Sequence, residues 1–218
     1  MLTATFAVLA ALHCRRHRPE ADIDIAVLAS GSGTNLQALL DTPTVVPHIS
    51  VVVSDRPGAR AITRATDCGV PTSVVAWGDH PDREAFSTAL ADAVEDHGAK
   101  GVVLAGFMRI LSPSFIERFP DRILNIHPSL LPSFPGAHPV ANALAHGVAI
   151  TGVTVHFVDE KVDNGPIVTQ VPVPVELGDT VDSLHARIRV EEHKVYPKVV
   201  EAFVQGRISA EGRHVRWR

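Results

Sequence analysis

Two polar side chains lie at the end of a predicted strand in the stretch LNIHPSLLPSFPG, residues 124–136. Asn125 and His127 alternate with apolar residues, so both point to the same face of that strand. Pro128 has no backbone N–H to donate to a neighbouring strand, so we expect the strand to end there and an irregular loop to follow. A histidine at a strand end is often only a hydrogen-bonded structural residue. An amide and an imidazole on one face are also groups that can stabilise a negatively charged oxygen.

A second polar stretch, VDEKVDNGP at residues 158–166, crowds acids into a turn between two predicted strands. Such acids are usually only solvated. Asn164 and Gly165 tolerate positive φ, so we expect the turn to curl tightly and to aim Asp163 inward. A carboxylate beside an imidazole raises its pKa, holds its orientation and can help to pass a proton through water. We therefore predict that Asp163 raises the pKa of His127.

These three groups suit acyl transfer to an amine. A neutral amine that attacks a formyl carbon generates a tetrahedral oxyanion and must lose a proton, and an imidazolium and a carboxamide N–H lower that barrier electrostatically. No nucleophilic side chain is needed if the amine attacks directly, and neither Cys14 nor Cys68 lies near these motifs. A metal site is the weaker interpretation, because the twelve histidines include no His-Glu-x-x-His or comparable ligand cluster.

The stretch SGSGTN, residues 30–35, places glycines between a predicted strand and the start of a helix. Free backbone N–H groups and the positive end of a helix dipole can hold an anion there. Gly31 and Gly33 allow a ligand to approach the backbone closely, and Thr34 and Asn35 offer side-chain donors. The pattern has neither the third glycine of a dinucleotide site nor the lysine of a P-loop. A tight turn without a ligand stays an alternative, and binding of a phosphate monoester is the favoured interpretation.

A sheet must position these motifs, because apolar runs alternate with amphipathic stretches from Asp24 onward. This alternation predicts a doubly wound, mostly parallel, Rossmann-like α/β sheet with helices on both faces. Ligands of such sheets bind at the carboxyl ends of the strands, where Asn125 and His127 are expected. The expected strands cover residues 23–30, 48–54, 70–75, 99–107, 122–127, 150–158 and 165–173. The expected helices follow the glycine turn and cover residues 56–69, 81–98, 112–119, 137–146 and 180–205.

Length and composition fit one domain, either compact or with two lobes, since 218 residues with 45% hydrophobic content can bury a full core. The formal net charge of −4 and the isoelectric point near 6.3 give no electrostatic reason to expect a nucleic-acid partner. The two cysteines have no metal spacing and suggest no disulfide framework. We therefore expect a cytoplasmic protein.

Residues 1–22 form an N-terminal extension that we predict to be dispensable. Its apolar run, Phe6–Leu12, is far too short to span a bilayer. Arg15, Arg16 and Arg18 follow this run, which is the reverse of a secretory signal. A short packing or association helix is the main alternative.

Several stretches occur in the order seen in one enzyme family: VLASGSGTNLQALL, VVLAGFMRILSPSF, LNIHPSLLPSFPGAH, GVTVHFVDEKVDNGPIVTQ and EEHKVYP. On these residues the chain resembles the phosphoribosylglycinamide formyltransferases, folate-dependent enzymes of purine synthesis. The match runs from about residue 25 to residue 208. It implies a formyltransferase domain over residues 23–208 and a C-terminal tail over residues 209–218, whose final EGRHVRWR we expect to be frayed.

The resemblance implies transfer of a formyl group from 10-formyltetrahydrofolate to the amine of glycinamide ribonucleotide, with no metal required. Asn125 and His127 take the oxyanion-stabilising roles and Asp163 supports them. The family's contacts with glycinamide ribonucleotide fall on Gly33, Thr34, Asn35 and Glu192. Its folate contacts fall on Arg83, Met108, Arg109, Ile110, Leu111 and Asn125.

Physical interpretation alone leaves several of these assignments open. By spacing, Glu192 is a solvated helix charge and Arg83 a surface residue, while Met108, Ile110 and Leu111 are equally well core residues. These roles therefore rest on the resemblance.

Two related activities are the closest alternatives. Methionyl-tRNA formyltransferase shares the Asn, His and Asp but needs a C-terminal nucleic-acid-binding domain, and formyltetrahydrofolate hydrolase usually carries an N-terminal regulatory domain, for which 22 residues are too few. A non-catalytic nucleotide- or folate-binding module does not need all three polar residues. We therefore expect small-molecule substrates, no nucleic-acid or membrane partner, and a monomer or homodimer.

Overall fold

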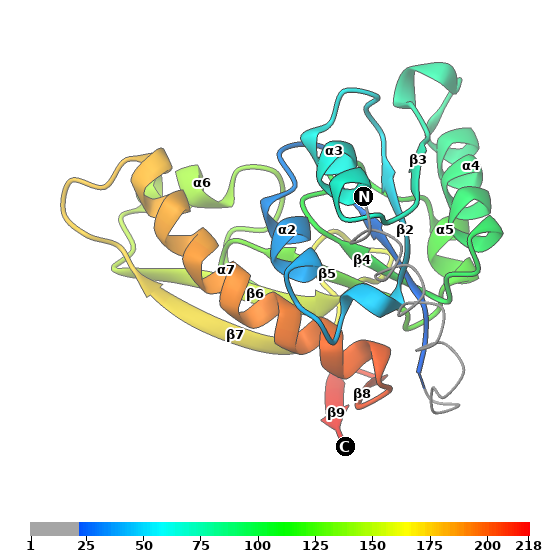
Figure 1. The fold of residues 1–218 in the computed structure, drawn as a ribbon. Coiled ribbons are helices and arrows are strands. Elements are labelled where there is room, and N and C mark those ends of the chain that lie inside the picture. Colours follow the sequence, from blue (N-terminus) through cyan, green and yellow to red (C-terminus); the bar gives the residue numbers. More distant parts are fainter. Residues whose placement is uncertain (1–21) are drawn as a thin grey trace, which may run out of the picture.

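A seven-stranded sheet with the strand order β3-β2-β1-β4-β5-β6-β7 forms the centre of the computed structural model, which describes residues 22–218 (Figure 1). Strands β1 to β5 pair in parallel, whereas β6 pairs antiparallel with both β5 and β7. The strands are β1 (Ile25–Leu28), β2 (Ile49–Ser54), β3 (Thr72–Val74), β4 (Gly101–Leu104), β5 (Ile123–His127), β6 (Ile150–Phe157) and β7 (Ile167–Pro174).

Helices cover both faces of this sheet. One face packs against α2, α3, α6 and α7, and the other against α4 and α5. The helices are α2 (Thr34–Leu40), α3 (Arg60–Asp67), α4 (Arg83–Asp96), α5 (Pro113–Arg118), α6 (Pro139–His146) and α7 (Val181–Val204), with short 3-10 turns at Val46–His48 and Trp77–Asp79. Every residue of β1, β2 and β4 is buried, as expected for parallel strands covered on both sides.

Local signals explain where several helices begin. The Oγ of Ser112 accepts a hydrogen bond from Phe115 N at 3.4 Å, so Ser112 is the N-cap of α5 as predicted. The carboxylate of Asp82 caps α4 in the same way, and Thr180 forms a capping box with Ser183 at the start of α7. The predicted fold class, a doubly wound and mostly parallel α/β sheet, is confirmed.

The strand order reverses between β1 and β4, and this reversal positions the site. β1 continues to β2 on one side, and β4 continues to β5 on the other. The loops that leave the carboxyl ends of β1 and β4 therefore diverge, which opens the crevice where open α/β sheets bind ligands. The glycine loop, residues 30–35, follows β1. Residues 105–111 follow β4, and His127 ends β5.

The C-terminal residues differ from the prediction. Instead of fraying, they form a hairpin of β8 (Ile208–Glu211) and β9 (His214–Trp217). In its turn, Arg213 donates to the carbonyl oxygen of Asn164, and its guanidinium lies 4.0 Å from Asp159. The hairpin therefore contacts the turn that carries Asp163, a contact between distant parts of the chain that a tail of mixed polar residues does not reveal.

The predicted N-terminal extension falls almost entirely outside the described residues. The buried core begins at Ile23, which is 8% exposed and donates its backbone N–H to Val204 O at 2.8 Å. No helix within residues 22–218 is long and apolar enough to cross a membrane.

Candidate active site

Asn125 and His127 lie on β5 at the carboxyl edge of the sheet, as predicted. Across the antiparallel pair, Asn125 is opposite His156 and His127 is opposite Thr154 on β6. Because side chains alternate along a strand, these four residues share one face of the sheet. Thr154 donates its hydroxyl to Ser129 O and accepts from Leu131 N, which holds the loop after β5 against β6.

Asp163 points inward, with 10% of its side chain exposed. Its Oδ2 lies 3.4 Å from Nδ1 of His127, and its Oδ1 lies 3.7 Å from Nε2 of His156. The turn achieves this geometry through Asp163 itself, whose φ is +51°. Gly165 is required two residues later, since a Cβ there would overlap the carbonyl oxygen of Phe157 at 1.9 Å. The predicted inward turn is therefore present, and its positive φ falls on Asp163.

His156 belongs to this cluster, and the sequence analysis missed it. Its Nδ1 donates to Phe157 O at 2.8 Å, and its Nε2 accepts from Nδ2 of Asn125 at 3.1 Å. These contacts fix the orientation of the Asn125 amide. No other described residue accepts a hydrogen bond from Nδ2 of Asn125. Antiparallel pairing of two strands with period-two polar residues was the signal that could have revealed His156.

The loop after β5 contacts both His127 and Asp163. Nε2 of His127 lies 2.9 Å from Phe134 O, and Gly136 N donates to Oδ2 of Asp163 at 2.7 Å. Phe134 has a φ of +54°, which is unusual for a bulky residue. The carbonyl of this residue therefore occupies the Nε2 side of the His127 ring.

The pKa of His127 departs from the prediction. Burial lowers the pKa of this imidazole below its usual 6.5, and the Phe134 carbonyl and the Asp163 carboxylate offset the effect only in part. Asp163 thus acts in the predicted direction, but the ring is 5% exposed and desolvation outweighs it. Burial alone would raise the pKa of Asp163, but contacts with His156, Gly136 N–H and His127 outweigh burial and lower it.

A cavity of about 260 Å³ lies against the glycine loop. Among the described residues, nothing accepts a hydrogen bond from the backbone N–H groups of residues 31–35. Three basic side chains line the same cavity, namely Arg56, His185 and Arg189, together with Glu192. Such a set of free N–H groups and guanidinium cations can hold a phosphate.

The predicted substrate residues converge at this cavity. Gly33 adopts a φ of +67°, and a Cβ on it would lie 2.8 Å from the backbone of Ala61. The glycine is therefore needed for packing against α3. Nδ2 of Asn35 donates to Oε2 of Glu192 at 3.0 Å, and Glu192 is 4% exposed. Glu192 is thus no solvated charge: burial raises its pKa, and the contact with Asn35 only partly opposes the shift.

Two basic residues of this cavity, His185 and Arg189, could have been found from helical spacing. His185, Arg189 and Glu192 are separated by four and three residues, which places them on one side of a helix. Of these three residues, only Glu192 was predicted to be a site residue.

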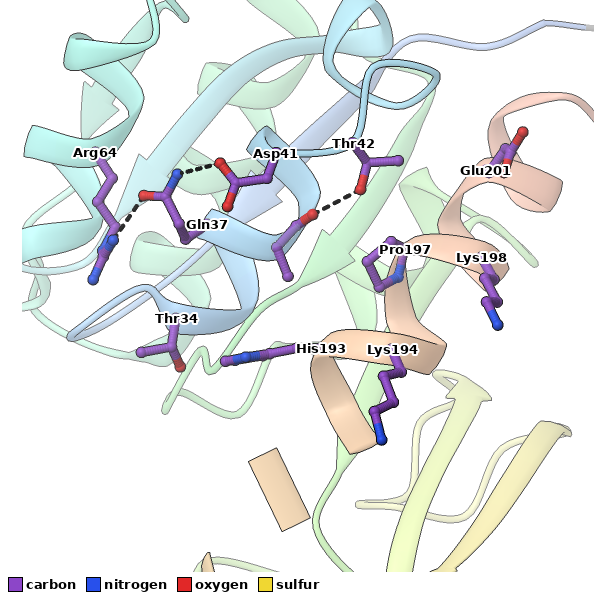
Figure 2. Close-up of a pocket in the computed structure, with 11 residues that line it drawn as sticks. Thr34, Gln37, Asp41, Thr42, Arg64, His193, Lys194, Pro197, Lys198 and Glu201 are labelled. Atoms are coloured by element: carbon purple, nitrogen blue, oxygen red, sulfur yellow. Dashed lines mark hydrogen bonds between the residues drawn. The ribbon is translucent and has the colours of Figure 1, made fainter. Parts of the chain in front are cut away.

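A larger cavity, of about 600 Å³, lies between α2 and α7 (Figure 2). It contains none of the catalytic candidates and shares only Thr34 with the smaller cavity. Beside α2, Arg64 of α3 donates to Ser32 O at 2.9 Å and to Oε1 of Gln37 at 2.7 Å. These contacts hold the glycine loop from the side of the larger cavity.

The predicted folate residues are divided by the structure. Met108 and Ile110 are 66% and 58% exposed, while Leu111 is buried at 7% and can present only its backbone to a ligand. Since Leu104 is in register with Asn125, the segment after β4 lies beside the end of β5. Arg83 is exposed at the start of α4, and no described residue bonds to its side chain.

Comparison with known proteins gives a consistent result. Residues 23–200 match the sequence profile of the formyl transferase family. The phosphoribosylglycinamide formyltransferase of Mycobacterium tuberculosis (strain ATCC 25618 / H37Rv) is 45% identical over 196 residues, which cover 89% of this chain and 91% of that protein. The trifunctional purine biosynthetic protein adenosine-3 of Bos taurus is 43% identical over 194 residues, or 87% of this chain. The chain spans about a fifth of the length of that protein and of its Gallus gallus counterpart.

The fold has the same relatives. A crystal structure of glycinamide ribonucleotide transformylase 1 from Symbiobacterium toebii superposes with a TM-score of 0.87 at 47% identity. The superposition covers 91% of this chain and 95% of that one. Sequence and structure therefore point to the same group of proteins.

Proposed function

The chain belongs to the formyl transferase family, and on this basis we propose that it transfers the formyl group of 10-formyltetrahydrofolate to the amine of glycinamide ribonucleotide in purine biosynthesis. The observation that carries the proposal is one connected cluster at the end of β5. Asn125 and Asp163 both contact His156, and Asp163 also contacts His127. This cluster lies at the same edge of the sheet as a cavity built for an anion.

The phosphate of the acceptor is proposed to bind at the glycine loop. Free N–H groups of residues 31–35 and the guanidinium of Arg189 supply hydrogen bonds and charge there. Glu192, held by Asn35, is placed to contact the ribose hydroxyls. These contacts orient the amine toward the end of β5.

The polar cluster is proposed to stabilise the charge that develops when the amine attacks. Asn125 donates an amide hydrogen and His127 an imidazole N–H to the oxyanion. Asp163 holds His127 and favours its protonated form, and it can pass the amine's proton to water. The Phe134 carbonyl must leave Nε2 of His127 for the substrate oxygen to bind.

The folate co-substrate is proposed to lie against residues 108–111. Met108 and Ile110 present exposed apolar surface, which suits a flat heterocycle. Arg109 and the backbone of Leu111 offer polar groups beside them, while Asn125 reaches the formyl group. A role for Arg83 stays a prediction from the resemblance, and the cytoplasmic location and the monomeric or dimeric state stay predictions from the sequence.

An assay with 10-formyltetrahydrofolate tests the proposal directly. Formyl transfer is measured with glycinamide ribonucleotide, with methionyl-tRNA, and in buffer without any acceptor. We expect product only with glycinamide ribonucleotide. Equal release of formate with and without the ribonucleotide would identify a hydrolase. Formylation of the tRNA would identify a methionyl-tRNA formyltransferase.

A further inference from the structure

Asp55, which directly follows β2, carries a buried carboxylate outside the catalytic cluster. Its side chain is 0% exposed, and its Oδ2 accepts from Nε of Arg109 at 2.7 Å. The guanidinium of Arg56 is farther away, at 4.0 Å and on an exposed side chain. Oδ1 of Asp55 has no hydrogen-bond partner among the described residues. The carboxylate is therefore directed mainly at one partner, Arg109.

Arg109 is held on a second side by an aromatic ring. Its guanidinium carbon lies 4.8 Å from the centroid of Trp77, a distance at which a cation is attracted to the ring face. Trp77 is in turn fixed by its backbone N–H, which donates to Asp55 O at 3.3 Å, and by an edge contact with Phe86 at 5.0 Å. The guanidinium is thus held between a carboxylate and an indole.

The Asp55–Arg109 pair holds the middle of the segment that follows β4. At one end of that segment, Met108 N donates to Oγ of Ser30 at 2.8 Å. At the other end, Ser112 N donates to Oγ of Ser87 at 3.1 Å. Between these ends, the Arg109 side chain makes the polar contacts that hold the segment, while its neighbours Met108 and Ile110 expose apolar side chains.

Stability alone is a weak reason for such a pair. Burying an ion pair costs desolvation energy that good geometry only repays, and here one carboxylate oxygen is left without a partner. What the pair does provide is a fixed position for Arg109 and its neighbours. A rigid, preformed surface binds a ligand with less loss of conformational entropy.

We propose that Asp55 is a positioning residue for the folate co-substrate: it holds Arg109 against Trp77 and so fixes the apolar platform of Met108 and Ile110. This inference rests on the proposed function, because that function assigns the platform to folate. The acceptor should be less affected, since the Ser30–Met108 contact beside the glycine loop does not involve Asp55.

Steady-state kinetics of Asp55→Ala and Asp55→Asn test the proposal. In Asp55→Ala the KM for 10-formyltetrahydrofolate is expected to rise about tenfold, with kcat and the KM for glycinamide ribonucleotide within about twofold of wild type. Asp55→Asn keeps an acceptor for Arg109 and is expected to show a smaller rise. A split between the two KM values is not expected from a general loss of stability.

The fluorescence of Trp77 provides a readout that needs no substrate. The chain has two tryptophans, so Trp217→Phe leaves Trp77 as the single reporter. Release of Arg109 in Asp55→Ala should expose the indole to water and shift its emission to longer wavelength. Asp179→Ala is the matched control, because it breaks another Asp–Arg pair, with Arg187 at 2.8 Å, far from this segment in the chain. It should lower the melting temperature without changing either KM or the Trp77 emission.

The possible results distinguish a failure of the proposed function from a failure of the inference about Asp55. A wild-type enzyme that transfers no formyl group would overturn the proposed function and this inference with it. An active wild type whose Asp55→Ala variant keeps its folate KM, or raises both KM values equally, would overturn the inference alone. An unchanged Trp77 emission in that variant would also contradict it, since Arg109 would then be held without Asp55.

Discussion

Nδ1 of His127 lies 3.4 Å from Oδ2 of Asp163, while Nε2 of the same ring lies 2.9 Å from the carbonyl oxygen of Phe134. A neutral imidazole carries a single N–H, so it can donate to only one of these acceptors. Protonation would satisfy both, but burial opposes it and lowers the pKa of His127. The charge of the His127 imidazole therefore depends on which group replaces the Phe134 carbonyl beside Nε2.

His127→Ala should lower kcat about 100–1000-fold, because one preorganised oxyanion donor is lost. The KM for glycinamide ribonucleotide should change little, since the phosphate and ribose bind elsewhere. His97→Ala, at the exposed end of α4, serves as the matched control and should keep wild-type kinetics. An increase in that KM with kcat unchanged would make His127 a binding residue.

Asp163→Asn keeps the shape of the side chain but removes its charge. The pKa of His127 should fall further, because the carboxylate is one of the groups that raise it. NMR titration of the His127 ring measures this directly. The double variant with His127→Ala should be no slower than the slower single variant, since residues that act as a unit are not additive. Multiplying losses would mean that the two residues act separately.

Arg189→Ala should raise the KM for glycinamide ribonucleotide about 10–100-fold, as expected for loss of a charged hydrogen bond to phosphate. The folate KM should stay near its wild-type value. Arg187→Ala is the control two residues away, because Arg187 bonds to Asp179 and does not line the cavity. That variant should lose thermal stability and keep both KM values. Equal effects of the two variants on KM would remove Arg189 from the phosphate site.

Stability should fall as the pH drops below 6.5. His127, His185 and His193 all have pKa values lowered from 6.5, in each case chiefly by burial. The unfolded chain then takes up protons before the folded chain does, so stability is lost from pH 6.5 down through the folded pKa values. The free energy of unfolding, measured in urea across this range, should depend less on pH in His127→Gln than in wild type. An identical slope would show that His127 does not carry this linkage.

Removing residues 1–21 should leave an active enzyme, because the buried core begins at Ile23. The cut should retain Asp22, whose carboxylate lies 3.9 Å from Nε2 of His48. Melting temperature and kcat should both match the full chain. A large drop in the melting temperature would show that the extension packs on the domain.

Much of this architecture was predictable because it depends on local signals. Apolar runs identified the buried strands, and Ser112 and Pro113 marked the start of α5. Period-two spacing placed Asn125 and His127 on one face, and the Asn164–Gly165 pair indicated a tight turn around Asp163. Each of these features is encoded within about ten residues.

What the sequence could not show depends on contacts between distant residues. The direction of the His127 pKa follows from how deeply the ring is buried. Likewise, Asp55 and Arg109 lie 54 residues apart, and nothing in either local stretch indicates that they meet. The burial of Glu192 against Asn35 has the same origin.

The contact of Arg213 with Asn164 has a practical consequence for experiments on this enzyme. An affinity tag or a surface linker fused to the C-terminus would be joined directly to β9, at the end of the hairpin opposite to its Arg213 turn. A pulling force on that end during immobilisation would act on β9, whose other end adjoins the contact with the turn of Asp163. Attachment through the N-terminus is therefore the better choice for purification and biosensor work.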